Sequence, residues 1–414
     1  MNQTYYHRTS CRLCGGVRLS KVFSLTPTPL ANAFVGKDQL GEEQYVYPLD
    51  MFFCEDCTHA QLLDVVDPLV LYRDYVYVSG TSAIFVQHFK EYATFVNSRF
   101  QLAKGSLVIE IGSNDGTLLR SFKDLGMQVL GIDPADEITR STVASGLEAI
   151  TGFFTPELAQ QLKATRGPAS VIAANNVIAH IDDLSGVMAG VYDLLADDGV
   201  FVFEVSYLVD VIEKNLFDTI YHEHLDYHSV KPLVEFFRSH GLELIEAIRV
   251  DSHGGSLRGV AQRIGGPRSV ADSVFEAISR EQSMGLDRAE TLRDFAVYVN
   301  KIKKELVELL SELKSQGKRI AGFGAPAKAT TLLHHFGVGS EYIDFIVDDS
   351  PLKQGLYSPG MHIPVVSSSE LYVRKPDYVL ILAWNFSESI IDKNAAFRDQ
   401  GGRFIVPLPT VKII

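Results

Sequence analysis

Alternating strand and helix patterns run through most of this chain. Four β-branched runs have the length of buried strands, at 107–111, 127–133, 169–175 and 199–206. Stretches with apolar residues at three-to-four spacing precede or separate these runs, the first at 83–100. Strands that alternate with helices indicate a parallel sheet covered by helices. The pattern therefore predicts an α/β domain, which we expect to occupy residues 76–265.

The second half of the chain repeats this organisation after a long polar helical region at roughly 267–316. The region has helical apolar spacing, and its charged residues are typical of a solvated helix face. A strand then leads into Gly322-x-Gly324-x-x-Ala327 and another helix. This order predicts a second α/β domain within 266–414. Taken alone, its glycine pattern would also fit NAD.

The composition excludes several classes of function. With 414 residues and 46% hydrophobic content, the chain can bury two or three cores of ordinary domain size. Its net charge is −13 and no run is dense in lysine or arginine, so we expect neither nucleic acid nor an anionic membrane as a partner. No apolar stretch approaches a membrane span, and the start MNQTYYHRTSC lacks a signal-peptide layout. We expect a cytoplasmic protein.

All four cysteines lie near the N-terminus and form two Cys-x-x-Cys pairs, Cys11 with Cys14 and Cys54 with Cys57. Disulfides are disfavoured in the cytoplasm, whereas two such pairs can place four thiolates tetrahedrally around one zinc ion. A redox pair or unrelated buried thiols are the alternatives. Four thiolates leave no open coordination position, so we expect a structural zinc in a module of residues 1–75.

A glycine-bearing turn follows the first strand of the predicted α/β domain. Glu110 lies at the strand end, and Gly112 and Gly116 lie in the turn before a new helix. Glycines let a ligand approach backbone amides at a helix N-terminus. Asp133 ends the next strand about twenty residues on, a position suited to two ribose hydroxyls. The turn lacks the Gly-x-Gly-x-x-Gly of dinucleotide-binding domains, so we expect a different nucleoside cofactor.

Several motifs in order carry a resemblance to a known family. Glu-x-Gly followed by glycine, with an acidic residue closing the next strand, is similar to the first two motifs of class I S-adenosylmethionine methyltransferases. Asn114 stands where the common form has a glycine. The fuller set is two Cys-x-x-Cys pairs, EIGSNDGTLL, NNVIAHIDD, YHEHLDYHS, SHGGSLR and a second nucleotide-type domain. Over nearly the whole chain, this order resembles the sugar C-methyltransferases that act on nucleotide-linked 4-keto deoxysugars.

This resemblance implies an α/β protein with three parts. They are a small N-terminal zinc module, a class I methyltransferase Rossmann-like domain, and a second, smaller Rossmann-like domain that helps to bind the nucleotide-sugar. The resemblance also implies S-adenosylmethionine as the cofactor and a dTDP-linked keto sugar as the substrate of a monomeric enzyme. The residues expected at the cofactor are Glu110, Gly112, Asn114, Gly116, Asp133 and Asn175.

The expected catalytic residues are the tetrad Tyr221-His222-Glu223-His224 and His180. A ketone at C4 acidifies the hydrogen on the adjacent carbon because the carbanion delocalises as an enolate, and histidine suits proton removal at neutral pH. The family pattern implies that His224 is the base. Tyr221 and His222 are expected to donate hydrogen bonds to the enolate oxygen, and Glu223 to orient a neighbouring group or a substrate hydroxyl. A surface loop of histidines is the alternative. For His180 the alternatives are substrate contact and a structural hydrogen bond.

Three further groups are candidates for substrate contact. Tyr75 and Tyr77 follow the zinc module, although tyrosine-rich linkers are often plain packing. A loop at 251–255 joins the two strands of a predicted hairpin, and it offers close backbone approach and a cation for phosphate. Lys328 lies near a helix N-terminus, where phosphates bind readily. The loop residues expected at the substrate are His253, Gly254, Gly255, Ser256 and Arg258.

The expected reaction is deprotonation next to the ketone and attack of the enolate on the methyl group of S-adenosylmethionine, at C3 of the sugar. Methylation at C5 stays open. Two other functions remain as alternatives. An O- or N-methyltransferase would need a base but no enolate stabilisation, and a zinc-ribbon binding protein would need no catalytic group.

Overall fold

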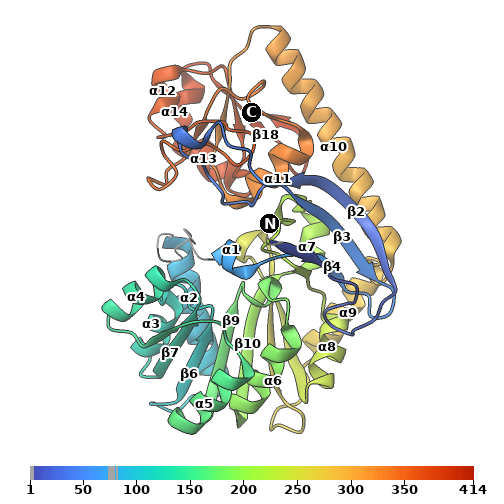
Figure 1. Ribbon diagram of the computed structural model, residues 1–414, viewed down its shortest axis with the longest axis vertical. Helices are drawn as coiled ribbons and strands as arrows, with labels where there is room; N and C mark the ends of the chain where they lie inside the picture. The colour runs from blue at the N-terminus through green and yellow to red at the C-terminus, as the bar shows by residue number, and fades with distance from the viewer. Residues whose placement is uncertain (1–3, 73–79, 81–82) are drawn as a thin grey trace.

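The computed structural model describes residues 4–72, 80 and 83–414. Three main sheets organise these residues, with seven, six and four strands. In Figure 1 the seven-stranded sheet lies at the bottom, the six-stranded sheet at the top, and the four-stranded sheet at the right between them. Tyr75 and Tyr77, which we expected at the substrate, lie outside the described residues.

The seven-stranded sheet has the order β12-β13-β10-β9-β6-β7-β8. The strand β13 runs antiparallel to both of its neighbours, and the other pairs are parallel. The carboxyl ends of the parallel strands therefore meet at one edge, where α/β sheets bind ligands. The strands are β6 (Leu107–Ile111), β7 (Gln128–Asp133), β8 (Ala149–Thr151), β9 (Ala169–Asn175), β10 (Leu195–Ser206), β12 (Leu242–Val250) and β13 (Ser256–Arg263).

Helices cover both faces of this sheet, which explains the continuous apolar runs in the sequence. Adjacent residues of β6 belong to different cores: Val108 packs in the core of α2 and α3, and Ile109 in that of α5, α6 and α8. This alternation follows from the two-residue repeat of a strand. The helices of this part are α2 (Ala83–Phe100), α3 (Thr117–Asp124), α4 (Asp136–Ala144), α5 (Pro156–Arg166), α6 (Leu184–Leu194), α7 (Leu208–Glu213) and α8 (Val230–Ser239).

The polar helical region forms two helices, α9 (Asp272–Ser283) and α10 (Ala289–Ser315). The buried residues of α10 recur at three-to-four spacing, as in Phe295, Val299 and Ile302. Phe295 contacts Phe23 edge-on, with ring centroids 5.9 Å apart. The long helix α10 therefore packs against the four-stranded sheet on its way to the C-terminal domain (Figure 1).

The six-stranded sheet has the order β16-β15-β14-β17-β18-β19 and is parallel except for β19. Its strands are β14 (Ile320–Phe323), β15 (Ile346–Val347), β16 (Val365–Val366), β17 (Tyr378–Ile381), β18 (Arg403–Val406) and β19 (Lys412–Ile413). Its helices are α11 (Ala327–Phe336), α12 (Glu370–Arg374), α13 (Ser387–Lys393) and α14 (Ala395–Asp399). Within the described ranges, no helix combines the length and the apolar character that crossing a bilayer requires.

The four-stranded sheet has the order β11-β4-β3-β2. Its edge strand β11 comes from far along the chain and pairs antiparallel with β4, so that Asp226 lies opposite Gln61. The sequence boundary expected at residue 75 therefore does not separate the sheets. The elements of this module are β1 (Tyr5–His7), β2 (Leu19–Thr28), β3 (Tyr47–Cys54), β4 (Ala60–Leu62), β5 (Asp64–Val66), α1 (Pro68–Tyr72) and β11 (Asp226–Tyr227).

Candidate active site

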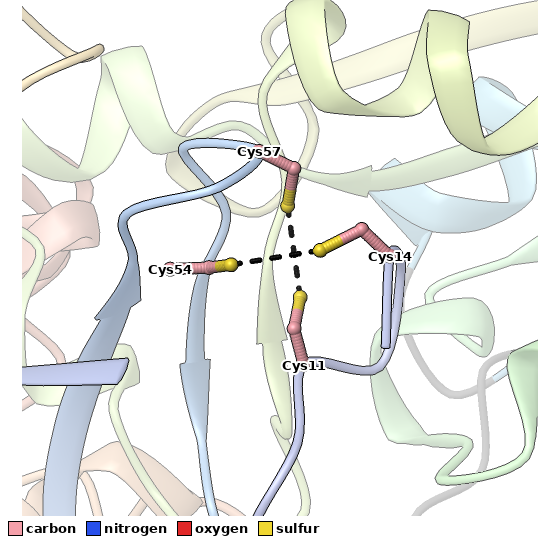
Figure 2. Close-up of side chains that lie close together, drawn as sticks. All are labelled: Cys11, Cys14, Cys54 and Cys57. Carbon is pink, nitrogen blue, oxygen red and sulfur yellow. Dashed lines mark hydrogen bonds between the residues drawn. The ribbon is translucent and has the colours of Figure 1, made fainter. Parts of the chain in front are cut away.

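Four thiols converge at one point of the N-terminal module (Figure 2). All four sulfur atoms lie within 4.8 Å of one another. The Sγ atoms of Cys11 and Cys57 are 3.6 Å apart, and so are those of Cys14 and Cys54. Sulfurs bound tetrahedrally to zinc at about 2.3 Å would be separated by about 3.8 Å. The four thiols therefore fit a zinc ion whose coordination positions are all filled.

We expect the purified protein to carry one zinc ion per chain. Serine in place of any one cysteine should lower the folding yield, because metal binding contributes directly to the folding of such modules. Elemental analysis of active protein, together with the yield of each serine variant, checks this expectation. Active protein with substoichiometric zinc would contradict it.

The turn between β6 and α3 has the conformation that its residue types allow. The φ angles of Gly112 and Gly116 are 69° and 74°, and that of Asn114 is 48°. Glycine adopts positive φ freely, and asparagine is one of the few other residues that tolerate it. Asn114 therefore keeps a left-handed backbone at the position where the common motif has glycine.

Asp133, at the end of the neighbouring strand β7, stabilises this turn through hydrogen bonds. One carboxylate oxygen accepts a hydrogen bond from the Asn114 N–H at 2.8 Å, and the other accepts one from the Ala135 N–H at 2.9 Å. Burial raises the pKa of Asp133. Each carboxylate oxygen can accept more than one hydrogen bond, so Asp133 can also receive ribose hydroxyls.

Buried polar atoms beside the turn fit a polar cofactor. Among the described residues, Glu110 Oε2 and Ser113 Oγ are buried without a hydrogen-bond partner. Burial and the charges of Asp133 and Asp115 raise the pKa of Glu110 well above its usual range. Since buried polar atoms are normally hydrogen-bonded, the polar groups of S-adenosylmethionine would supply suitable partners here. Asn175 ends β9 at the same edge of the sheet.

Tyr221 and His224 face each other in the turn after the short helix η4 (Phe217–Thr219). The Tyr221 hydroxyl lies 3.0 Å from Nε2 of His224, and Nδ1 of His224 lies 2.8 Å from the carbonyl oxygen of Thr219. A carbonyl can only accept, so Nδ1 carries the proton and Nε2 presents its lone pair. Burial lowers the pKa of His224 to about 4. The imidazole is therefore neutral at neutral pH.

The other two members of the tetrad point toward the N-terminal module. His222 is 1% exposed, and its Nε2–H donates to the carbonyl oxygen of Pro48 at 3.1 Å. Glu223 accepts a hydrogen bond from the Asn32 side chain at 3.0 Å. The Nε2–H of His222 is engaged with the N-terminal module in this structure, so the expected donation to an enolate stays a prediction. Glu223 orients Asn32.

His180 lies beside His224. It ends the short helix η3 (Ile178–His180), which follows β9, and the two imidazole rings stack with centroids 5.0 Å apart. The ring of Tyr72 is parallel to His180 within 8° at 6.3 Å. The Leu225 N–H donates to the Ala179 carbonyl at 2.7 Å, which ties the two histidine-bearing loops together. The structure thus brings His180, Tyr221 and His224 into one group.

An open pocket of about 670 Å³ lies beside α2, with His88, Ser252 and Arg258 in its lining. Arg258 Nε donates to Glu204 Oε1 at 2.7 Å, and His88 Nε2 lies 2.7 Å from Glu204 Oε2. Burial alone would raise the pKa of Glu204, but the bonds from His88 and Arg258 lower it. Arg258 is therefore paired with Glu204 while it lines the pocket, and its expected contact with a substrate phosphate stays a prediction.

The hairpin loop packs more closely on the protein than we expected. Gly254 and Gly255 have φ angles of 91° and 139°, and a Cβ on Gly255 would lie 2.2 Å from Cγ of Asp210. Gly255 is therefore needed for packing against α7. Ser256 is buried, and its hydroxyl donates to the Ser252 carbonyl at 3.0 Å. His253 lies in the short helix η5 (Ser252–Gly254) of this loop.

Lys328 lies at the start of α11, between two domains. Its Nζ is 4.5 Å from the ring centroid of Trp384 and 3.9 Å from Asp218 Oδ2. Trp384 Nε1–H donates to Asp218 at 2.6 Å. Burial lowers the pKa of Lys328, and the charge of Asp218 opposes that shift. The lysine therefore links the C-terminal domain to the turn that carries Tyr221.

Sequence models of known families match consecutive parts of the chain. A zinc binding domain matches residues 11–72, a methyltransferase domain 85–247, and a C-methyltransferase C-terminal domain 251–409. The C-methyltransferase NovU of Streptomyces niveus is 37% identical over 404 residues, which cover 98% of this chain and 96% of NovU. The chain belongs to the C-methyltransferase family. It is an S-adenosylmethionine-dependent enzyme, and its four cysteines form a zinc site.

Further relatives match a smaller share of this C-methyltransferase. A ubiquinone biosynthesis O-methyltransferase of Burkholderia thailandensis is 26% identical over 161 residues, which cover 36% of this chain and 69% of that protein. A solved structure of magnesium protoporphyrin IX methyltransferase from Synechocystis PCC 6803 is 14% identical. The likeness covers 43% of this chain and 83% of that chain, with a TM-score of 0.35.

Acid should destabilise this C-methyltransferase through its buried histidines. Burial lowers the pKa of His228 to about 4. An unfolded histidine has a pKa near 6.5, so between about pH 6.5 and 4 the unfolded chain takes up a proton that the folded protein does not. The neutral His228 ring therefore contributes its full stabilisation above about pH 6.5, and this stabilisation is lost as the pH falls from there to about 4.

The variant His228→Phe cannot take up this proton. We expect its loss of Tm between about pH 7.5 and about pH 5 to be smaller than that of the wild type. Any constant packing cost of the larger ring cancels in this difference. Equal pH dependence of the two Tm values would contradict the prediction.

Three residues at the candidate site of the C-methyltransferase were not predicted from the sequence. Thr219 orients His224 through its backbone carbonyl, which no residue-type pattern reveals. The Glu204 carboxylate lies 2.7 Å from Nε2 of His88, and His88 lines the pocket. A signal for Glu204 was present, because a carboxylate within the buried run VFVFEV requires a partner.

Proposed function

We propose that the enzyme methylates a carbon next to the ketone of a nucleotide-linked 4-keto deoxysugar, namely C3 of a dTDP-linked sugar. The observation that carries the proposal is the fixed tautomer of His224. Its Nδ1–H donates a hydrogen bond to the Thr219 carbonyl at 2.8 Å, which leaves the Nε2 lone pair as the proton acceptor. A neutral imidazole with its lone pair held in one direction can accept a proton, which is what a general base does.

In this mechanism Nε2 of His224 takes the proton from C3, and the electrons of the broken C–H bond move onto the ketone oxygen. The resulting imidazolium is stabilised by the Thr219 carbonyl, whose hydrogen bond becomes charge-assisted. The Tyr221 hydroxyl, 3.0 Å from Nε2, turns from the imidazole to the enolate oxygen as a hydrogen-bond donor. S-adenosylmethionine supplies the electrophilic methyl group that C3 then receives.

Two further observations support a nucleotide-sugar substrate. The motifs of the chain resemble those of enzymes that use such substrates, and NovU is named a C-methyltransferase. Lys328 places a cation at the start of α11, where a helix N-terminus also favours phosphate. Its interaction with Asp218 is long, at 3.9 Å, so a diphosphate could compete for the ammonium group.

Hydrogen exchange tests the proposal without methyl transfer. The enzyme, bound to S-adenosylhomocysteine in deuterated water, should exchange the hydrogen at C3 of a dTDP-linked 4-keto deoxysugar. The corresponding 4-hydroxy sugar is the matched control, because it cannot form an enolate. With S-adenosylmethionine, NMR should then place the new methyl group on C3. Absence of exchange, or a methyl group on oxygen, would refute the proposal, and exchange at C5 would move the site of methylation.

A further inference from the structure

The residues around His224 are held by the N-terminal module. The chain after His224 continues through Leu225 into β11, which pairs with β4 of that module. The Leu62 N–H donates to the Leu225 carbonyl at 2.8 Å, and the Leu225 N–H donates to Ala179 at 2.7 Å. The loop with His180 and the loop with His224 are therefore tied to each other and to the module.

Arg12 lies where these loops meet. It stands inside the first zinc-binding pair, between Cys11 and Cys14, and its side chain is fully buried. Arg12 Nε donates to Asp182 Oδ1 at 2.8 Å. Arg12 Nη1 lies 3.9 Å from Asp226 Oδ1 and donates to the Leu225 carbonyl at 3.4 Å.

The spacing of these partners links Arg12 to both histidines. Asp182 follows His180 by two residues, and Asp226 follows His224 by two residues. The rings of the two histidines stack with their centroids 5.0 Å apart. The Arg12 guanidinium thus bridges the two loops that carry these histidines. A guanidinium is planar with donors in fixed directions, so it sets the separation of two carboxylates in a way that a lysine cannot.

Asp226 is itself fixed on its far side. Its carboxylate lies 2.6 Å from His59 Nε2, and both side chains are fully buried. The Arg12 Nη1 also donates to the Leu62 carbonyl at 2.5 Å. The Asp226 end of the bridge therefore rests on a residue next to the zinc-binding cysteines, since His59 follows Cys57 by two positions.

We propose that Arg12 is a positioning residue for proton abstraction: from within the zinc-binding turn, its guanidinium sets His180 and His224 relative to each other. Zinc then has a second consequence beyond folding, because it fixes the turn that carries Arg12. This inference rests on the proposed role of His224 as the base.

The variant Arg12→Lys tests the inference because it keeps the positive charge and loses the planar guanidinium with its fixed donor directions. We expect kcat and the rate of C3–H exchange to fall roughly 10- to 100-fold, since a misplacement of about 1 Å can cost 10²-fold. Zinc content, affinity for S-adenosylhomocysteine and KM should stay at wild-type values. The matched control is Arg18→Gln, because Arg18 pairs with Asp56 in the other zinc-binding turn and is largely exposed. That control should exchange at the wild-type rate.

Two results of the exchange assay would overturn the inference. One is exchange by Arg12→Lys at the wild-type rate. The other is a parallel loss of zinc, cofactor affinity and exchange, which would mean a purely structural role. If Arg12→Lys does not fold, Asp182→Asn serves instead, because Asp182 is partly exposed and the substitution removes the carboxylate charge that Arg12 and Arg8 pair with on the His180 side.

NMR of ring-labelled histidines provides a readout that does not depend on the substrate. In Arg12→Lys, or in Asp182→Asn, the ring signals of His180 and His224 should shift, whereas in Arg18→Gln they should not. Unshifted signals would refute the positioning role. If the wild type exchanges no keto sugar but these signals shift, the proposed function fails and the positioning role stands.

Discussion

Replacement of His224 by asparagine or alanine should leave both ligands bound and reduce turnover by roughly 10²–10⁴-fold, the usual contribution of a general base. Nε2 is the atom that the fold prepares for this role, because the Thr219 carbonyl holds the proton on Nδ1. Neither variant retains a basic nitrogen at that place. The measurement is the rate of C3–H exchange in deuterated water, which separates proton abstraction from methyl transfer.

The variant Tyr221→Phe refines this prediction. It removes the hydroxyl that lies 3.0 Å from Nε2 but leaves the base in place, so it should reduce exchange less than the His224 variants. A loss as large as theirs would mean that the Tyr221 hydroxyl stands between His224 and the substrate.

His240→Asn is the matched control for His224. His240 also has Nδ1 at 2.8 Å from a backbone carbonyl, that of Phe236, but it lies at the end of α8. Its replacement should leave exchange at the wild-type rate. Wild-type exchange by the His224 variants would show that His224 is not the base, and His180, whose ring stacks on it, would be the next candidate.

Replacement of Asp133 by alanine should weaken S-adenosylmethionine binding by roughly 10- to 100-fold, because a hydrogen bond to a charged group contributes about 1.5–3 kcal/mol. Asp133 has two tasks in the structure. It accepts the Asn114 N–H that holds the glycine turn, and from its place at the end of β7 we expect it to accept the ribose hydroxyls. Calorimetric titration with the cofactor measures the effect.

Asp136→Ala is the control for this prediction. Asp136 lies three residues further on, in the first turn of α4, where it is exposed and pairs with Arg140. Its loss should leave cofactor affinity unchanged. If Asp133→Ala binds the cofactor as tightly as the wild type, the placement of the ribose at Asp133 is wrong.

The sequence allowed prediction of features that depend on local periodicity and spacing. Buried runs such as 107–111 became strands because a parallel sheet covered on both faces needs continuous apolar residues. The two Cys-x-x-Cys pairs predicted a four-sulfur cluster, and the sulfur positions confirm it. Such signals lie within a few residues of each other, so they can be read without knowledge of the fold.

Features that depend on contacts between distant segments could not be predicted in this way. The tetrad 221–224 looked like one chemical unit, yet its side chains diverge because the backbone turns there. His222 donates to Pro48, and Arg258 is neutralised by Glu204. Both partners are far away in the sequence, and neither residue type indicates which partner it will meet. The bridge from Arg12 to Asp182 and Asp226 was hidden for the same reason.

The pairing of β11 with β4 limits which domains can be exchanged between enzymes of this architecture. A chimera that joins the zinc module of one relative to the methyltransferase domain of another would pair a foreign β4 with the resident β11. It would also present foreign partners to the buried Asp226. Transplantation of residues 4–66 together with 217–230 moves both halves of that contact at once. The part of this chain that has to be exchanged as a whole therefore consists of two separate segments, and the expected domain boundary at residue 75 falls between them.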